Sequence, residues 1–356
     1  MNVRAAKLNS RPDSVARSIS APKPGWREQV RSAFRSPTAL LDFLGLDNRA
    51  LTTPTRGSFG LLVPETFARR MRPGDPQDPL LRQVLPDPDE IVSRPGFDRD
   101  PVGDLASLSA PAILHKYQGR ALLMLTGACA VHCRYCFRQH FPYSGETASG
   151  ERWAAACRYL AQDESIDEVI FSGGDPLMLS TDRLAAITAD LGAIGHIRRL
   201  RIHTRMPVIL PDRVNPSLLR WLDELPWPVI LVIHANHPAE FDREVDTALD
   251  RLKTAGVHLL NQAVLLRGIN DRPETLKQLM ERGFTAGVLP YYLHQLDRVA
   301  GSARFEVDQA QARTLIEHLR ASLPGYLVPR LVVEQAGQPS KTPLVDHAAK
   351  AEMLLP

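Results

Sequence analysis

Three cysteines that lie within eight residues of one another, Cys129, Cys133 and Cys136, have the clearest chemistry in the chain. Cysteine thiolates are the usual ligands of iron–sulfur clusters, and three on one short loop can hold three corners of a four-iron, four-sulfur (4Fe-4S) cluster. The fourth iron then stays open to a substrate or cofactor, as in catalytic zinc sites. With only four cysteines in the chain, this spacing predicts a metal site rather than a disulfide framework.

Structural zinc is the alternative for the same cysteines, with His132 or His140 as the fourth ligand. Zinc fingers usually pair two short ligand loops that a dozen or more residues separate, and the sequence has no second loop of this kind. A zinc-stabilised binding module is therefore a hypothesis of a different class. Iron and sulfide analysis would separate it from the cluster.

A second candidate motif, Ser172-Gly173-Gly174-Asp175, follows an apolar run. Glycines allow the backbone to approach a ligand closely, and a carboxylate at the end of a strand can accept a hydrogen bond from an ammonium group. On its own, such a motif is usually only a turn.

The elements that must position these residues alternate between short apolar runs and amphipathic stretches from Ala121 onward. The expected strands are Ala121–Leu125, Glu168–Phe171, Leu200–His203, Val229–Ile233, Leu259–Leu265 and Gly287–Tyr291. The expected helices are Trp153–Leu160, Thr181–Leu191, Pro216–Leu222, Val245–Ala255, Pro273–Arg282 and Val307–Leu319. Six such units predict a parallel α/β sheet with helices outside. Since a complete barrel has eight units, we expect a partial (βα)6 TIM-like barrel with its functional residues at the C-terminal ends of the strands.

The regions around this barrel differ in composition. Residues 1–25 are rich in Arg, Ser and Pro and are expected to form a mobile arm. Residues 26–110 should form a mainly helical, wrapping region, with two short helices broken near Ser36-Pro37. The barrel should occupy residues 111–300, and residues 301–356 should form a C-terminal extension.

Charge and hydropathy exclude several classes of protein. Lys and Arg together number 43 against 40 Asp and Glu, so the net charge of +3 gives no indication of a nucleic-acid partner. The apolar runs are far shorter than the roughly 20 residues of a membrane helix. Residues 1–23 contain no apolar core of a secretory signal. We expect a cytoplasmic protein with neither a nucleic-acid nor a membrane partner, and the sequence leaves the oligomeric state open.

Tyr135, just before the third cysteine, completes a loop that resembles the radical S-adenosylmethionine superfamily. The resemblance implies reductive cleavage of S-adenosylmethionine to a 5'-deoxyadenosyl radical. It also implies that the stretch from Ser172 through Gly173 and Gly174 to Asp175 holds the amino group of S-adenosylmethionine.

A narrower resemblance, to the lysine 2,3-aminomutases, runs from about residue 60 to the end of the chain. The segments that carry it are His115-Lys116-Tyr117 with Arg120, Cys133–Arg138, Pro290–Tyr292, His294–Asp297 and Ser340–Pro343. It implies that Lys341 forms a Schiff base with pyridoxal 5'-phosphate, as lysine amines do with aldehyde cofactors. The glycines that precede this lysine in the family are replaced here by Gly337-Gln338-Pro339-Ser340.

The same resemblance assigns the remaining site residues. Arg138 matches the arginine that binds the substrate carboxylate, for which a guanidinium is well shaped. Asp297 and Glu334 match the two acids that hold the distal ammonium of lysine. Candidates for cofactor contacts are Tyr117 and Arg120 for the phosphate, and His234 and Gln262 for S-adenosylmethionine or the pyridoxal ring, with a buried structural role as the alternative for the last two.

The reaction implied is that of an isomerase. A radical removes hydrogen from the β-carbon of L-lysine, the nitrogen migrates from the α- to the β-carbon, and β-lysine results. An electron donor must reduce the cluster. The alternatives are a radical enzyme without pyridoxal phosphate and a free-lysine 2,3-aminomutase of catabolism or biosynthesis.

Free-lysine enzymes continue into a C-terminal segment that binds zinc and builds the oligomer, whereas this chain has 15 residues after Lys341. This shorter chain, with the segments from Trp26 onward, Pro79–Leu85 and Pro95–Phe97, resembles the bacterial group that makes β-lysine for elongation factor P. The β-lysine is expected to be the R form. That resemblance implies a functional link to the factor and to the separate lysyl ligase that modifies it.

Overall fold

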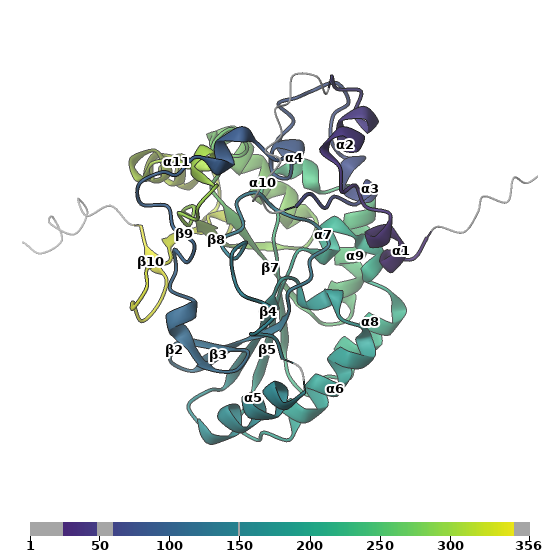
Figure 1. Cartoon of the computed structure of the whole chain (residues 1–356), viewed down its shortest axis with the longest axis vertical. Coiled ribbons are helices and arrows are strands. Elements are labelled where there is room, and N and C mark those ends of the chain that lie inside the picture. Colours follow the sequence, from purple (N-terminus) through teal and green to yellow (C-terminus); the bar gives the residue numbers. More distant parts are fainter. Residues whose placement is uncertain (1–23, 48–59, 149, 345–356) are drawn as a thin grey trace, which may run out of the picture.

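A ten-stranded sheet, with its strands in chain order from β1 to β10, organises the residues that this computed structural model describes, 24–47, 60–148 and 150–344 (Figure 1). The strands are β1 (Leu108–Ala110), β2 (Ile113–Tyr117), β3 (Arg120–Thr126), β4 (Glu168–Gly173), β5 (Arg199–Thr204), β6 (Val229–Ile233), β7 (His258–Val264), β8 (Leu289–His294), β9 (Arg330–Val333) and β10 (Thr342–Pro343). Strands β3 to β9 pair in parallel, whereas β1, β2 and β10 add antiparallel edges. Because β1 and β10 do not pair with each other, the barrel is open.

The helices that connect the parallel strands are α5 (Glu151–Gln162), α6 (Thr181–Gly192), α8 (Pro216–Asp223), α9 (Arg243–Thr254), α10 (Pro273–Thr285) and α11 (Gln309–Ser322). Figure 1 shows α5, α6, α8 and α9 following one another along the outside of the sheet. Several begin at a side chain that accepts a hydrogen bond from the first turn, as Asp242 does from the Val245 N–H at 2.8 Å. The alternating pattern therefore predicted the fold class, an α/β partial barrel, correctly.

The structure also differs from the sequence prediction at the end of the sheet. The sixth expected strand, Gly287–Tyr291, is displaced to Leu289–His294, because Gly287 has a φ of +81° and belongs to the turn after α10. Strand β9 adds a seventh parallel strand of only four residues, and β10 contains two. Runs this short have no detectable period in the sequence.

The N-terminal residues form short elements that lie against the cysteine loop. Helices α1 (Trp26–Arg31) and α2 (Pro37–Phe43) are separated near Ser36, as expected, and α3 (Glu65–Ala68) and α4 (Pro79–Arg82) follow. Backbone hydrogen bonds join His132 N–H to the Leu62 carbonyl (3.0 Å) and Arg134 N–H to the Gln83 carbonyl (2.9 Å). The N-terminal region thus supports the loop that carries the cysteines.

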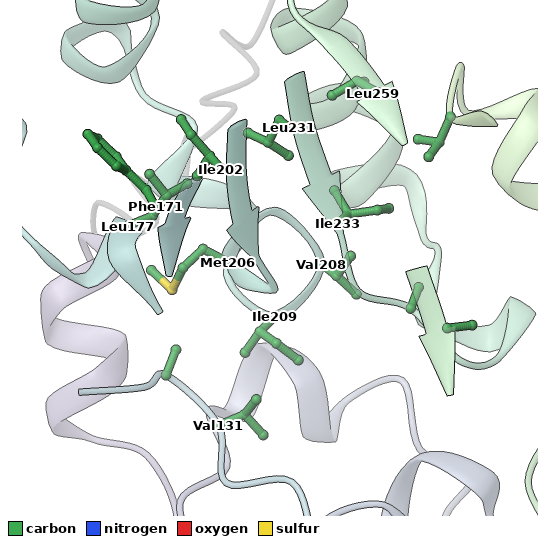
Figure 2. Close-up of a cluster of buried hydrophobic side chains, with 14 of the residues drawn as sticks. Val131, Phe171, Leu177, Ile202, Met206, Val208, Ile209, Leu231, Ile233 and Leu259 are labelled. Atoms are coloured by element: carbon green, nitrogen blue, oxygen red, sulfur yellow. The ribbon is translucent and has the colours of Figure 1, made fainter. Parts of the chain in front are cut away.

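One buried turn of helix, α7 (Met206–Ile209), lies across the C-terminal ends of the central strands (Figure 2). Figure 2 shows Met206 beneath Ile202 of β5, and Ile209 directed toward Val131 of the cysteine loop. All four of these side chains are buried. Apolar packing therefore supports the loop from the barrel side.

Most of the two chain ends lies outside the described residues. The arm predicted at 1–25 lies, except for residues 24 and 25, outside the described residues, as do residues 345–356. Among the helices of the described ranges, none is both long enough and apolar enough to cross a membrane.

Candidate active site

A cavity of about 270 Å³ opens at the C-terminal ends of the strands. It is lined by all fifteen residues that the sequence analysis proposed for the cluster, the other cofactors or the substrate: Tyr117, Arg120, Cys129, Cys133, Cys136, Arg138, Ser172, Gly173, Gly174, Asp175, His234, Gln262, Asp297, Glu334 and Lys341. They come from the turn between β2 and β3, the cysteine loop, the ends of β4, β6 and β7, the segment after β8, and the β9–β10 hairpin. The fold thus brings residues from most of the chain to one site.

The three cysteines have free thiols on the loop that follows β3. Burial raises the pKa of Cys129, and burial raises that of Cys136 to about 12. The charge of a neighbouring thiolate raises both pKa values further. Three partly buried thiolates need a compensating positive charge, which the irons of a cluster would supply. The donor set fits a four-iron, four-sulfur cluster, in which each thiolate binds a different iron.

The two histidines considered for zinc lie elsewhere. His132 Nδ1 is 2.6 Å from the Gly60 carbonyl oxygen, and His140 Nε2 is 3.4 Å from that of Ala300. Neither lines the cavity. Within residues 24–47, 60–148 and 150–344, no three His, Cys, Asp or Glu side chains are arranged to hold a single metal ion.

The Gly173-Gly174 pair allows the end of β4 to contact the start of the cysteine loop. Gly174 N–H donates to the Thr126 carbonyl at 2.6 Å. A Cβ on Gly174 would lie 2.8 Å from the carbonyl carbon of Ala128, and Gly173 has a φ of +125°. Side chains at these positions would push the two segments apart, so the glycines serve packing as well as any ligand.

The carboxylate of Asp175 is occupied by structural hydrogen bonds. It accepts from Thr204 Oγ1 (2.7 Å), Arg205 N–H (2.7 Å) and Leu177 N–H (3.0 Å). Burial raises the pKa of Asp175 to about 6. Asp175 therefore joins the end of β4 to the end of β5, a role that the sequence did not indicate. Its contact with an amino group stays a prediction.

Glu334 and Lys341 face each other across the β9–β10 hairpin. Val333 of β9 pairs with Thr342 of β10, Glu334 follows Val333, and Lys341 precedes Thr342. The Lys341 ammonium donates to Glu334 Oε2, and Lys116 Nζ lies 3.0 Å from Glu334 Oε1. Burial alone would raise the pKa of Glu334, but these two ammonium groups lower it to about 2. Glu334 is therefore ionised throughout the physiological range.

A further pair of contacts joins Lys116 to the predicted carboxylate-binding arginine. Lys116 Nζ lies 2.7 Å from Asp104 Oδ1, and Asp104 Oδ2 accepts from Arg138 Nε at 2.6 Å. Arg138 Nη1 also donates to Ser172 Oγ at 3.2 Å. The side chain of Asp104 is only 2% exposed, so both ion pairs are shielded from water. They fix the direction of the Arg138 guanidinium.

Five polar atoms of the residues that line the cavity have no hydrogen-bond partner: Asp104 Oδ1, which has only its ion-pair contact with Lys116, Arg205 Nε, Asp297 Oδ1, His203 Nε2 and His234 Nε2. Burial, and next the charge of Glu334, raise the pKa of Asp297 to about 7. Burial lowers the pKa of His234 to about 4, so this imidazole is neutral. Buried polar groups are normally satisfied, and a bound ligand would satisfy these.

The residues predicted for cofactor contacts from β2, β3 and β7 also face the cavity. Tyr117 and Arg120 pair across the β2–β3 turn, with the guanidinium carbon 4.6 Å from the centre of the tyrosine ring. Burial and the charge of Glu334 raise the pKa of Tyr117, which keeps the phenol protonated. Gln262 lies on β7 and lines the cavity with them.

Sequence reasoning missed several residues of this wall. Arg201 and His203 line the cavity, and Arg205 follows them at the same spacing of two. This alternation along β5 was the signal that could have found them. Lys116 lies in the segment His115-Lys116-Tyr117, but the resemblance gave it no role. Asp104 lies in an irregular segment, where neither a motif nor a periodic pattern pointed to it.

Comparisons with known proteins identify the family of this chain. Residues 123–280 match the model of the radical SAM superfamily. The chain is 45% identical over 322 residues to the L-lysine 2,3-aminomutase of Escherichia coli K12, covering 90% of this chain and 94% of that one. The Haemophilus influenzae protein of the same name is 42% identical over 319 residues, covering 89% and 94%. That of Clostridium subterminale is 33% identical over 325 residues, covering 90% and 78%.

These matches contradict the zinc-stabilised binding module, because the relatives are radical enzymes that share most of this chain. Membership implies the cofactors expected from the sequence: a 4Fe-4S cluster, S-adenosyl-L-methionine and pyridoxal 5'-phosphate. The chain belongs to the lysine 2,3-aminomutase family of radical S-adenosylmethionine enzymes, which are isomerases.

Proposed function

We propose that this protein converts L-lysine to β-lysine, with Cys129, Cys133 and Cys136 as cluster ligands and Lys341 as the lysine that binds pyridoxal phosphate. One observation carries the proposal: the cysteine loop and Lys341, separated by most of the chain, line the same cavity. When bound, the cluster and S-adenosylmethionine would supply the radical, and pyridoxal phosphate would carry the migrating nitrogen.

The charges on the cavity wall describe the substrate. Arg138, oriented by Asp104, offers a guanidinium to a carboxylate. Asp297 and Glu334 offer carboxylates to an ammonium, and Asp297 still has an oxygen without a partner. A molecule with a carboxylate at one end and an amine at the other, such as lysine, satisfies both ends.

Lys341 and Glu334 must change partners for this site to work. The amine of Lys341 is held as an ammonium by Glu334, and it has to lose a proton at Nζ before it can add to an aldehyde. The Oε2 of Glu334 would be free to accept from the distal ammonium of the substrate only when the Lys341 amine has turned away from it. Lys341 and the substrate ammonium thus compete for the same carboxylate oxygen.

Two walls of the cavity position the cofactors. Tyr117 and Arg120 are proposed to hold the phosphate, because a guanidinium suits phosphate oxygens. Ser172, Gly173, Gly174 and Asp175 are proposed to contact S-adenosylmethionine. His234 and Gln262 are proposed to contact either S-adenosylmethionine or the pyridoxal ring.

Reconstituted protein supplied with L-lysine, S-adenosylmethionine, pyridoxal phosphate and a reductant tests the activity, with β-lysine as the readout. Cys133→Ala should abolish turnover, whereas Cys157→Ala, which changes the cysteine outside the loop, should retain it. The absence of β-lysine from protein with a complete cluster would refute the proposal. Activity without pyridoxal phosphate would instead favour the radical enzyme that lacks this cofactor.

The finer proposal is that the product, expected as (R)-β-lysine, is made in the cytoplasm for elongation factor P. It is supported by the segments that resemble this bacterial group, Pro79–Leu85 and Pro95–Phe97. The cognate lysyl ligase and factor, added to the aminomutase reaction, should modify the factor faster than the same mixture with L-lysine and no aminomutase, measured by mass spectrometry as the gain of one lysyl group. If the ligase attaches α-lysine as readily, the free-lysine alternative is favoured.

A physiological electron donor, such as a flavodoxin or ferredoxin, should replace the chemical reductant.

A further inference from the structure

A buried arginine that the proposed reaction does not use lies behind the cysteine loop. Arg205 follows β5 directly and is only 7% exposed. Its Nη1 donates to the Sγ of Cys133 at 2.8 Å and to the hydroxyl oxygen of Tyr135 at 2.9 Å. Tyr135 lies between Cys133 and Cys136 in the sequence. Arg205 therefore contacts the cysteine loop at two points.

The other side of the guanidinium is anchored to the protein. Nη2 of Arg205 donates to Glu240 Oε2 at 2.9 Å and to Gln83 Oε1 at 2.7 Å. Glu240 is fully buried and also accepts from the Asn236 N–H at 2.9 Å. Asn236 Nδ2 in turn donates to the Tyr135 hydroxyl oxygen at 2.7 Å. The two terminal nitrogens of Arg205 thus make four hydrogen bonds, which fix the guanidinium from both sides.

The main chain of Arg205 is held as well. Its N–H donates to Asp175 Oδ2 at 2.7 Å, so the Gly-Gly-Asp turn determines where the arginine begins. Residues from the end of α4 and from the segment that follows β6 therefore meet at the guanidinium, and the segment that follows β4 holds the main chain of the same arginine.

We propose that Arg205 is a positioning residue for the cluster and that it raises the reduction potential of that cluster. The inference rests on the proposed cluster ligands Cys129, Cys133 and Cys136. Reduction adds negative charge, and a cation that donates a hydrogen bond to a ligating sulfur stabilises the reduced state more than the oxidised state. Burial strengthens this effect because a low dielectric screens charge poorly. Glu240 opposes it, since its carboxylate offsets part of the guanidinium charge.

Potentiometric titration of the reconstituted full-length protein, followed by electron paramagnetic resonance of the reduced cluster, tests this proposal. Arg205→Gln should shift the midpoint potential to more negative values, and Glu240→Gln should shift it to more positive values. We expect each change to alter the reduction equilibrium at least tenfold, which is 59 mV for one electron. General damage to the fold would not move the two variants in opposite directions.

Arg213 provides a matched control. It is 1% exposed and donates to the backbone carbonyls of Leu177 at 2.7 Å and Leu179 at 3.1 Å, but it does not line the cavity. Arg213→Gln should lower the melting temperature and leave the potential unchanged.

The outcomes separate this inference from the proposed function. Iron and sulfide analysis comes first, and a wild-type protein without a cluster would reject the proposed ligands, and this inference with them. If the cluster is present, a wild-type potential in Arg205→Gln overturns the role of the arginine. If Arg205→Gln does not retain a cluster, the Glu240→Gln variant provides the test. A midpoint potential of Glu240→Gln that is equal to the wild-type value or more negative overturns the proposal.

Discussion

The ammonium of Lys116 lies 2.7 Å from the carboxylate of Asp104 and connects the two ends of the proposed substrate site. Asp104 orients Arg138 at the carboxylate end, and the same ammonium contacts Glu334 at the amine end. Lys116 therefore holds both ends in a fixed relation. A substitution there should affect stability and substrate affinity together.

Replacement of Lys116 by methionine leaves two buried carboxylates without their shared cation. Because Asp104 keeps Arg138 and Glu334 keeps Lys341, we expect the loss of a hydrogen-bonded charge, about 1.5–3 kcal/mol of unfolding free energy, which chemical denaturation would measure. We also expect the KM for lysine to rise at least about tenfold, which corresponds to about 1.4 kcal/mol of binding.

Lys253→Met is the control for this change. Its ammonium lies 3.2 Å from Asp250 on the surface of α9, where both side chains are more than half exposed. Exposed pairs of this kind contribute at most about 1 kcal/mol. Similar losses of stability in the two variants would contradict the bridging role of Lys116.

Lysine binding should depend on pH through Asp297, whose pKa is raised to about 7 by burial and by Glu334. An ammonium is bound by the ionised carboxylate, so the KM for lysine should fall about tenfold between about pH 6 and about pH 8. Asp297→Asn should raise KM and remove this dependence. A wild-type KM that is constant over this range would contradict the assignment.

The same carboxyl should also make stability depend on pH. Its folded pKa is above the unfolded value, so the folded state binds more protons and loses stability as pH rises from about 4 to about 7. The protein without cofactors should therefore gain stability from Asp297→Asn at about pH 8 and gain little at about pH 4. Thermal unfolding at the two pH values measures the difference.

Gly174→Ala should displace the cysteine loop, because a Cβ would overlap the carbonyl group of Ala128. We expect a loss of about 1–3 kcal/mol in unfolding free energy and a lower iron content after reconstitution. Gly192→Ala is the control, since no atom lies within 4 Å of a Cβ at that position at the end of α6. It should be neutral or stabilising by up to about 1 kcal/mol. Equal iron content in the two variants would show that the loop does not depend on this close contact.

Lys341→Ala should remove the visible absorbance of bound pyridoxal phosphate and abolish β-lysine formation. The iron content should stay at the wild-type level, because Lys341 is paired with Glu334 and is not one of the proposed cluster ligands. Lys277→Ala, at an exposed side chain of α10, should leave both readouts unchanged. Retained absorbance in Lys341→Ala would place the cofactor on another amine.

The sequence predicted the parts of the structure that have a period or a motif. Alternating apolar runs identified the strands from β3 to β8. The cysteine spacing proposed Cys129, and the family resemblance proposed Arg138 and Lys341; the structure brings all three to one cavity, and their roles stay predictions. The sequence did not predict β9 and β10, because a strand of four residues and one of two carry no periodic signal. Asp104 was missed for another reason: it acts through Arg138, which lies 34 residues away in the sequence, and only the folded chain shows the contact.

Strand β10 is the most weakly attached part of the cavity wall. It pairs only with β9, and its second residue, Pro343, has no N–H to donate. Of the described strands around the cavity, it therefore costs the least free energy to detach, and such local opening precedes global unfolding. The hairpin that bears Lys341, the lysine proposed to hold the cofactor, is thus the part of the cavity wall that should open first as the protein is destabilised.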